Sequence, residues 1–420
     1  MAIKTYIVKV ASRCNLNCSY CYMYNMGDTT YLQQPKFMDM GIVRAFAERL
    51  KEYYKDREQN SIYIAFHGGE PLMASPEFYQ EAVKIIRDTL NGVEVYFTMQ
   101  TNGTLLTEEW AKLLNELDIQ VGISIDGPEA FHDKFRVYHN GKPSFTEVVE
   151  AFKIRNKHGV GGLITVVNPE IDVVELYNLF AELLPKKLNL LLPDSNYMNT
   201  DFYLNKTEGE TRYGDWLVDL YELWKNDDPE TRPEITFFSN IIRNLLGNEV
   251  ADERFGSMKC EVACLETNGA LEVVDPLRSC GHGFTRNRLN IKKNNIEDLE
   301  KEALYQVYSD GHQLLNNKCQ NCPVKELCGG GYLVHRYSKE RGFDNPSIYC
   351  YDMIRIITHI QNDFVKSLGN HLREGLGVSP ITYEEVTDYL KNSPDTSPEP
   401  ETEASKILQQ FATRKKEVIC

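Results

Sequence analysis

Six short runs of apolar and β-branched residues alternate with amphipathic stretches of helical period in the first half of the chain. They predict strands near residues 6–10, 62–66, 93–99, 121–125, 163–167 and 188–192, and helices near 38–54, 76–90, 108–117, 145–158 and 173–184. Repeated βα units build a parallel sheet, so the expected fold class is α/β, a partial (β/α)6 TIM-like barrel. Functional groups in such a sheet collect beyond the carboxyl ends of the strands.

The composition is that of a soluble, folded protein. The chain has 420 residues, 42% of them hydrophobic and 25% charged, which allows one large domain and at least one smaller one. The formal net charge is -15 without a dense cluster of Lys and Arg, which argues against a nucleic acid or an anionic membrane as partner. No apolar run approaches the length of a membrane span, and the first residues lack the features of a signal peptide. We therefore expect a cytoplasmic protein.

Eleven cysteines are many for a cytosolic protein, and an odd number in a large chain fits a secreted disulfide framework poorly. Three of them stand together at 14–21, and none follows for more than two hundred residues. Seven more fall within 260–350, whereas Cys420 ends the chain beyond an acidic, proline-rich stretch and is taken as incidental. This distribution indicates metal ligation at two separate sites.

The N-terminal triplet of Cys14, Cys18 and Cys21 follows the first predicted strand directly, so three thiolates project from one short loop. A [4Fe-4S] cluster takes four ligands, and three cysteines in so short a segment leave one iron open for chemistry. Zinc is the alternative, but a structural zinc site needs a fourth ligand and usually pairs C-x2-C units. The spacing therefore favours a catalytic iron-sulfur cluster.

With Tyr20 as its aromatic residue, the triplet resembles the radical S-adenosylmethionine (SAM) superfamily, whose signature is C-x3-C-x-aromatic-C. Three further segments agree with that family in order and in strand position. They are Gly68-Gly69-Glu70-Pro71 after the second strand, Thr101-Asn102-Gly103 after the third, and Ser124-Ile125-Asp126-Gly127-Pro128 at the end of the fourth. One such segment alone is commonly an ordinary turn, but all of them in register are hard to obtain by chance.

The resemblance implies a set of residues that bind SAM: Tyr20, Gly68, Gly69, Glu70, Pro71, Asn102, Ser124, Arg136 and Leu192. Within this set the GGEP segment would hold the amino group of SAM. Ser124 and Arg136 would contact the ribose and the carboxylate, and Tyr20 and Leu192 would lie beside the adenine. A solvated loop arginine is the alternative for Arg136, and plain core packing is the alternative for Leu192.

The second cysteine region comprises Cys260, Cys264, Cys280, Cys319, Cys322, Cys328 and Cys350. Judged alone, its C-x2-C unit favours a structural zinc site. Beside the N-terminal triplet it resembles the SPASM domain of radical SAM enzymes that act on peptides, which implies two auxiliary [4Fe-4S] clusters. The last four cysteines would hold the distal cluster and the first three the nearer one. The family pattern places one more cysteine where this chain has Tyr332, so the nearer cluster has an open iron, is completed by another group, or is partly degenerate.

These features divide the chain into a radical SAM partial barrel at 1–195, a helical bridge at 196–255, a SPASM domain at 256–350, and C-terminal helices with an acidic linker at 351–420. The resemblance covers roughly the first 350 residues. It implies SAM and three [4Fe-4S] clusters as cofactors, one catalytic and two auxiliary. Reduction of SAM at the catalytic cluster would supply a 5'-deoxyadenosyl radical that abstracts hydrogen from an unactivated carbon.

The stretch from Gly329 to Cys350 resembles maturases that build cyclophane crosslinks, in which an aromatic ring carbon is joined to a β-carbon with loss of two hydrogens. We therefore expect a radical SAM oxidoreductase that crosslinks side chains of a ribosomally synthesised precursor peptide. An external reductant such as flavodoxin or ferredoxin would supply the electrons. Since the first strand begins almost at the start of the chain, the precursor's leader would be bound by the bridge and tail helices or by a separate leader-recognition protein.

Several alternatives stay open. An anaerobic sulfatase-maturating enzyme, which forms formylglycine, shares the fold but carries an acidic base after the position of Cys280, where this chain has Gly281 and His282. Thioether-forming and excising peptide maturases share the barrel motifs. A zinc-binding scaffold or a plain electron carrier needs no SAM site. Three further residues are candidates either for proton transfer or for ordinary polar packing: His67, Asp275 and His335.

Overall fold

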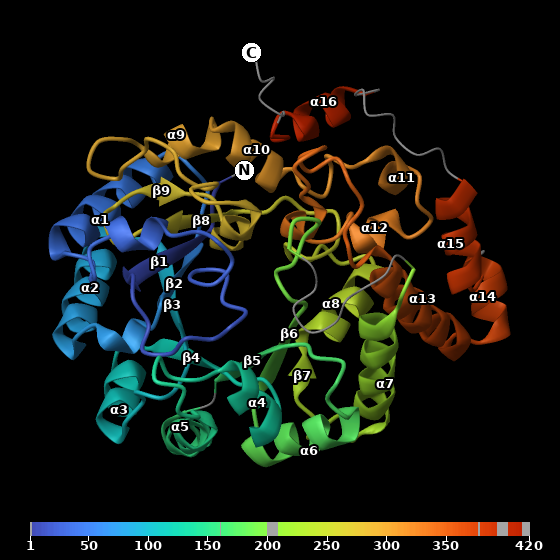
Figure 1. Ribbon diagram of the computed structural model, residues 1–420, viewed down its shortest axis with the longest axis horizontal. Coiled ribbons are helices and arrows are strands. Elements are labelled where there is room, and N and C mark those ends of the chain that lie inside the picture. Colours follow the sequence, from blue (N-terminus) through green and yellow to red (C-terminus); the bar gives the residue numbers. More distant parts are fainter. Residues whose placement is uncertain (1, 160, 200–208, 377–378, 393–401, 414–420) are drawn as a thin grey trace. The chain divides into compact units, whose positions relative to one another are not determined.

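The computed structural model describes residues 2–159, 161–199, 209–376, 379–392 and 402–413 (Figure 1). The chain forms two compact units. The first unit consists of Met1–Val166, Asn178–Leu192 and Glu261–Gln306, and the second of Val167–Tyr177, Pro193–Cys260 and Val307–Cys420. Each unit has its own core and is described by itself.

The first unit is built on a parallel sheet, as the sequence predicts. Its six successive strands are β1 (Thr5–Ala11), β2 (Ser61–Gly68), β3 (Glu94–Thr101), β4 (Ile119–Ser124), β5 (Gly162–Val166) and β6 (Lys187–Leu191). Each strand pairs in parallel with the next one along the chain, so their carboxyl ends lie along one edge. The predicted α/β class is confirmed, and every predicted strand lies within two residues of an observed one at each end.

Helices between these strands cover one face of the sheet, where Figure 1 shows α1, α2 and α3 outside the first strands. The predicted helices are α1 (Met40–Tyr54), α2 (Pro76–Thr89), α3 (Glu108–Glu116), α5 (Phe145–His158) and α6 (Val173–Leu183). The side chains of Asp39, Ser75 and Thr107 accept backbone N–H bonds at the starts of α1, α2 and α3, which fixes where each helix begins. A shorter helix, α4 (Glu129–Phe135), was not predicted from the sequence.

The two faces of the sheet differ in chemistry because side chains alternate along a strand. On the helix-covered face, Tyr6 packs edge to face on Phe46 of α1, with ring centroids 5.3 Å apart. Lys9 therefore points to the opposite face, where it is paired in register with His67 of β2. A polar side chain on that face recurs at Gln100 of β3 and Ser124 of β4, which hydrogen-bond each other at 2.8 Å.

The first unit also contains strands that the sequence analysis did not identify. Strand β8 (Val262–Leu265) pairs in parallel with β1, and β9 (Leu271–Glu272) pairs antiparallel with β8. The 3-10 helix η3 (Asp275–Cys280) follows, and then α9 (Ile296–Glu300). Two further 3-10 helices, η1 (Thr30–Gln33) and η2 (Pro71–Met73), lie after β1 and β2.

The second unit is mainly helical. Its elements are α7 (Arg212–Asn226), β7 (Glu234–Ile235), α8 (Thr236–Leu245), α11 (Asn317–Gln320), α12 (Lys325–Cys328), η4 (Leu333–Arg336), α13 (Cys350–Ser367), α14 (Asn370–Leu376), α15 (Tyr383–Asn392) and α16 (Glu403–Gln409), and α10 (Ala303–Ser309) runs into it from the first unit. Helices α7 and α13 lie side by side (Figure 1). Tyr221, Trp224 and Phe238 form an aromatic core between α7 and α8.

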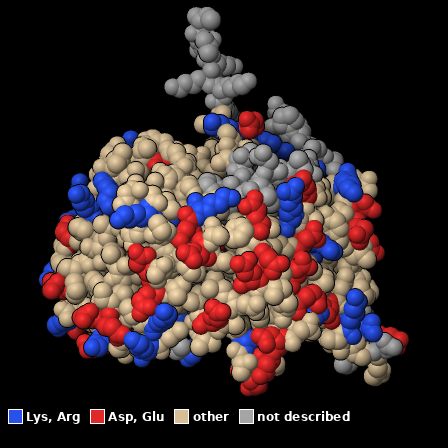
Figure 2. All heavy atoms as spheres, turned by 60° about the horizontal axis from the view of Figure 1, so that its bottom comes forward, with Lys and Arg blue, Asp and Glu red and all other residues tan. Residues whose placement is uncertain are grey.

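None of the helices in the described ranges is both long enough and apolar enough to cross a membrane. Acidic and basic side chains are interspersed on the face of the molecule in Figure 2.

The contact between α7 and α13 depends on a glycine. A Cβ atom at Gly214 would lie 2.8 Å from the Cα atom and the carbonyl oxygen of Asp352, and the Gly214 N–H donates to the Asp352 carboxylate at 2.9 Å. We predict that Gly214→Val lowers the free energy of unfolding by about 1–3 kcal/mol through overpacking. Gly369→Val, at a site without neighbours within 4 Å, is the control and should change it by less than about 0.5 kcal/mol. If thermal unfolding showed the same decrease in the free energy of unfolding for both variants, this explanation by packing would be contradicted.

Candidate functional site

The cysteine loop, residues 14–21, begins just beyond the carboxyl end of β1. Its backbone is held by the last residue of α4 and by the segment that follows this helix. The N–H of Asn17 donates to the carbonyl of Val137 at 2.7 Å, and the N–H of Ser19 donates to the carbonyl of Phe135 at 3.0 Å. The buried side chain of Leu16 secures the middle of the loop. The predicted ligands therefore sit on a loop whose backbone is anchored at several points.

The three thiols of this loop interact with one another. Burial raises the pKa of each thiol, to about 12 for Cys21, and the charge of Cys18 adds to the shift at Cys14 and Cys21. The sulfur of Cys14 also accepts hydrogen bonds from the Leu16 N–H at 3.4 Å and the Asn102 amide at 3.7 Å. Such N–H donors stabilise negative charge on sulfur, and bound iron does so more strongly. The donor set fits an iron-sulfur cluster.

In the described part of the chain, no three His, Cys, Asp or Glu side chains converge as the ligands of one metal ion do. The thiolates of a four-iron cluster bind separate iron atoms, so they stand further apart than the ligands of a single zinc ion.

Two glycines bring the end of β2 against the start of the cysteine loop. Gly68 has a φ of +129°, and a Cβ atom there would lie 2.1 Å from the carbonyl oxygen of Ala11. A Cβ atom at Gly69 would lie 2.2 Å from the carbonyl oxygen of Arg13. The N–H groups of Gly69 and Glu70 donate to these same carbonyls at 2.8 and 3.1 Å. The GGEP segment thus requires glycine for close backbone approach.

Glu70 is fully buried, and its carboxylate is held in place by hydrogen bonds. One oxygen accepts from the Leu72 N–H at 3.0 Å and the Thr101 hydroxyl at 2.7 Å, and the other accepts from the Asn102 N–H at 2.8 Å. Burial raises the pKa of Glu70, while these donors lower it. Because a carboxylate has about four acceptor positions, one stays available for a cationic ligand group.

Asn102 joins the GGEP segment to the cysteine loop. Its backbone binds Glu70, and its side-chain amide donates to the Asn15 side chain at 2.9 Å and to the Cys14 sulfur. Its side-chain oxygen accepts from the Thr104 hydroxyl at 2.7 Å. The structure therefore brings together the predicted residues Cys14, Glu70 and Asn102.

A second cluster joins the other end of the cysteine loop to the segment after β4. The Tyr20 hydroxyl donates to the Asp126 carboxylate and accepts from the Arg136 guanidinium at 2.7 Å. Arg136 lies 3.6 Å from Asp126 and is only 8% exposed, so it is not a solvated loop side chain. The Nε of Arg136 has no hydrogen-bond partner among the described residues. Its charge lowers the pKa of the nearby Cys18 thiol, although burial raises that pKa overall.

The remaining predicted SAM contacts are less closely tied to these clusters. Ser124 accepts from Gln100 at the end of β4. Pro71 begins η2, and its carbonyl accepts from the buried Tyr79 hydroxyl at 2.6 Å. Leu192 directly follows β6 and is half-buried. Their roles in binding SAM stay predictions.

The distal cysteine set lies in the second unit. Cys319 is in α11, Cys322 follows it in a turn, Cys328 ends α12 and Cys350 begins α13. Burial raises the pKa of Cys328 to about 12, and the nearby thiols of Cys319 and Cys322 contribute to that rise. The next three residues, Gly329, Gly330 and Gly331, have positive φ angles, so α12 ends at Cys328 and the chain changes direction there.

Arg336 is a functional candidate that the sequence analysis missed. It is 1% exposed and donates to the carbonyls of Gly311 and Leu314, each at 2.7 Å. Burial raises the pKa of the Cys319 thiol to about 11, and the charge of Arg336 lowers it. A buried cation beside these thiols would stabilise an anionic cluster. No sequence signal separates a buried arginine in so short a helix from one at the surface.

The three cysteines predicted for the nearer cluster are distributed over both units. Cys264 lies in β8 and Cys280 ends η3, both in the first unit, whereas Cys260 belongs to the second. Tyr332, which stands where the family pattern has a cysteine, is 7% exposed and packs edge to face against His335 with ring centroids 5.4 Å apart.

The other proton-transfer candidates have separate surroundings. Asp275 is 2% exposed and paired with Lys9 at 3.2 Å. The Nδ1 atom of His67 has no hydrogen-bond partner among the described residues, and burial lowers the pKa of this side chain. His335 is buried between Tyr332 and Tyr349 in the second unit.

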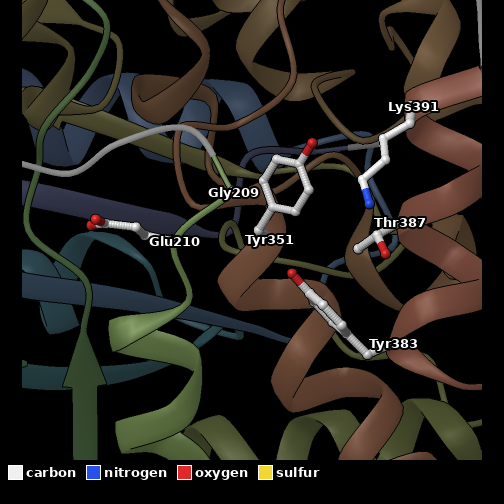
Figure 3. Close-up of a pocket in the computed structure, with 6 residues that line it drawn as sticks. All are labelled: Gly209, Glu210, Tyr351, Tyr383, Thr387 and Lys391. Carbon is white, nitrogen blue, oxygen red and sulfur yellow. The ribbon is translucent and has the colours of Figure 1, made fainter.

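A surface pocket of about 600 Å³ lies in the second unit, and none of the predicted site residues lines it. In Figure 3 the rings of Tyr351 on α13 and Tyr383 on α15 border it, and the amine of Lys391 lies toward the hydroxyl of Thr387. Gly209 and Glu210, which precede α7, complete the lining.

The chain is similar to known proteins over most of its length. The sequence model of the radical SAM superfamily matches residues 8–180. A cysteine-type anaerobic sulfatase-maturating enzyme of Clostridium novyi is 28% identical over 360 residues, which cover 82% of this chain and 91% of that protein.

Solved structures share the fold. Native anSMEcpe with bound AdoMet and Cp18Cys peptide has a TM-score of 0.73 at 24% identity and covers 86% of this chain and 98% of its own. Streptococcus suis SuiB bound to precursor peptide SuiA has a TM-score of 0.53 at 16% identity and covers 79% of this chain and 72% of its own. The fold is thus common to all three.

Gly68→Ala tests the close approach that holds the cysteine loop. The added Cβ overlaps the Ala11 carbonyl, so we predict a loss of bound iron and a free energy of unfolding about 1–3 kcal/mol below that of a matched variant. Gly141→Ala is that match, because its φ of +79° is also positive and no neighbour lies within 4 Å. Iron analysis and calorimetry of anaerobically purified protein would measure both effects. Indistinguishable variants would disprove the role of Gly68.

Proposed function

Because the chain belongs to the radical SAM superfamily, we propose that it is a maturase that oxidatively crosslinks side chains of a ribosomally synthesised precursor peptide. The observation that carries the proposal is the joining of the cysteine loop to the GGEP segment through Asn102 at the carboxyl edge of the sheet. That arrangement brings the predicted ligand Cys14 and the buried Glu70 carboxylate to the same residue, Asn102, which supports a shared site for a cluster and its cosubstrate. Relatives named for sulfatase maturation and a neighbour bound to a precursor peptide support a polypeptide substrate.

In this proposal Cys14, Cys18 and Cys21 hold the catalytic [4Fe-4S] cluster. Together with SAM, that cluster supplies a 5'-deoxyadenosyl radical that abstracts hydrogen from the substrate. The AdoMet bound in the structural neighbour supports SAM as cosubstrate.

The protein's own residues would bind and orient SAM. The buried carboxylate of Glu70 accepts from the amino group of SAM, because it has an acceptor position left and is fixed by Thr101 and Asn102. Arg136 donates to the SAM carboxylate, since its Nε is buried and has no other acceptor among the described residues. Its link to Tyr20 and Asp126 sets its direction.

We further propose an auxiliary [4Fe-4S] cluster on Cys319, Cys322, Cys328 and Cys350, with Arg336 offsetting its negative charge. A cluster held by these cysteines would supply an acceptor for the electron that leaves when a substrate radical forms a new bond. A second auxiliary cluster near Cys260, Cys264 and Cys280 stays a prediction. So do the external reductant, flavodoxin or ferredoxin, and a separate leader-recognition protein.

Formylglycine formation is the second candidate, and a specific observation favours it. The relative from Clostridium novyi is named as a cysteine-type anaerobic sulfatase-maturating enzyme and aligns with 82% of this chain. The residues after Cys280 support crosslinking instead, because a sulfatase-maturating enzyme would carry an acidic base there. In this chain Gly281 has no side chain, and the His282 side chain is 57% exposed beside Asp28. The stretch from Gly329 to Cys350 adds to that support.

Anaerobic co-expression with the small reading frame beside the gene tests the proposal. We expect the precursor peptide to lose two hydrogens, as found by mass spectrometry, and to stay unreactive toward a hydrazide probe. Oxidation of a serine to formylglycine also removes two hydrogens, so mass alone does not separate the two candidates. An aldehyde that reacts with hydrazide would establish the second candidate.

Cys18→Ala is the control for this experiment and should leave the peptide unmodified, because the catalytic cluster loses a ligand. An unmodified peptide beside wild-type protein with fully loaded clusters would contradict the maturase proposal.

A further inference from the structure

Helix α4 lies between two charged residues that meet, Asp126 before the helix and Arg136 at its carboxyl end. Their side chains lie 3.6 Å apart, and both contact the Tyr20 hydroxyl. Asp126 is 2% exposed, and its other carboxylate oxygen accepts from the Val166 N–H at the end of β5 at 3.0 Å. Asp126 is therefore fixed by the sheet, whereas the position of Arg136 depends on how the two ends of α4 are held.

A buried imidazole within α4 is linked to the backbone at both ends of the helix. His132 is 0% exposed. The backbone N–H of Asp126 donates to its Nδ1 atom at 3.3 Å, and its Nε2 atom lies 3.0 Å from the hydroxyl oxygen of Ser144. That hydroxyl lies 2.6 Å from the carbonyl oxygen of Arg136. Two side chains thus connect the residue before the helix to the residue that ends it.

Only one arrangement of protons satisfies this chain of hydrogen bonds. A backbone N–H can only donate, so Nδ1 of His132 is the acceptor and the ring proton is on Nε2. A carbonyl oxygen can only accept, so the Ser144 hydroxyl donates to Arg136 and accepts from Nε2. Burial and the charge of Arg136 lower the pKa of His132 to about 2, which keeps the imidazole neutral, as the chain requires.

Ser144, the middle of this chain, has a second support. It is 0% exposed, and its backbone N–H donates to the Asp133 carboxylate of α4 at 2.9 Å. The N–H of Phe145, the first residue of α5, donates to the same oxygen at 2.9 Å. Asp133 therefore ties α4 to the start of α5 without the Ser144 hydroxyl. Removing that hydroxyl should break the chain of hydrogen bonds and leave the path of the backbone in place.

We propose that His132 and Ser144 are positioning residues for SAM binding, which hold Arg136 where its guanidinium meets the SAM carboxylate. The inference rests on the proposed function, because that proposal assigns Arg136 to SAM. Both ring nitrogens of His132 are already used within the chain of hydrogen bonds. The imidazole therefore acts on SAM through Arg136 and not by touching it.

Ser144→Ala breaks the chain without removing a charge or a ring. We expect the dissociation constant of SAM to rise about tenfold, because a buried donor and a buried acceptor lose their partner. Equilibrium dialysis with anaerobically prepared holoenzyme measures this constant, and the iron content per chain should equal that of the wild type. The SAM concentration for half-maximal 5'-deoxyadenosine formation should rise by the same factor, with a smaller change in the rate at saturating SAM.

Ser75→Ala is the matched control, because Ser75 is also a serine just before a helix of the first unit and caps α2. It should leave the affinity for SAM unchanged. A second comparison separates the ring from its hydrogen bonds. His132→Leu should weaken SAM binding more than His132→Asn, whose side-chain oxygen can still accept from the Asp126 N–H.

A double-mutant cycle tests whether the effect passes through Arg136. Arg136→Gln alone should raise the dissociation constant of SAM at least about tenfold. Adding Ser144→Ala to Arg136→Gln should raise it less than about twofold further, because residues that act through one contact are not additive.

Unchanged SAM affinity in both Ser144→Ala and His132→Leu would overturn the positioning role and leave the proposed function intact. Fully additive effects of Ser144→Ala and Arg136→Gln would overturn the route through Arg136. Wild-type holoenzyme that holds its clusters but does not bind SAM would overturn the proposed function as well.

Discussion

Close backbone contact between the end of β2 and the start of the cysteine loop is the constraint on which the rest of the site depends. Gly68 and Gly69 leave no room for a Cβ atom, so the carbonyls of Ala11 and Arg13 accept N–H bonds from the GGEP segment. The same contact carries Glu70 to a position where Asn102 bridges it to Cys14. The proposed cluster ligand Cys14 and the carboxylate proposed to bind the cosubstrate are thereby fixed by one set of hydrogen bonds.

Buried charge distinguishes the cysteines from one another. Arg136 lies near Cys18 and Arg336 near Cys319, so each of these thiols has a cation that favours its thiolate form. Burial and nearby carboxylates raise the pKa of two others, with Glu70 acting at Cys14 and Asp275, Glu266 and Glu272 acting at Cys264. The spacing of the cysteines along the sequence does not reveal this difference, because the charged residues come from strands and turns far away in the chain.

Much of the fold could be predicted from the sequence, because alternation of β-branched runs with helical periods is a local property. The motifs after β1, β2 and β3 could be placed for the same reason. Strand β8 could not, since its four residues gain their pairing from β1, more than two hundred and fifty residues earlier. Lys9 could not be given a partner either, and no pattern in the sequence marks Arg336 of η4 as buried. Tertiary contacts decided these cases.

The central claim is that Cys14, Cys18 and Cys21 hold a cluster with an open iron that binds SAM. Measuring 5'-deoxyadenosine formed from SAM by dithionite-reduced protein tests it most directly. The account predicts formation by the wild type and by a Cys319→Ala variant, and none when the three N-terminal cysteines are all replaced by alanine. Undiminished 5'-deoxyadenosine from that triple variant would contradict it.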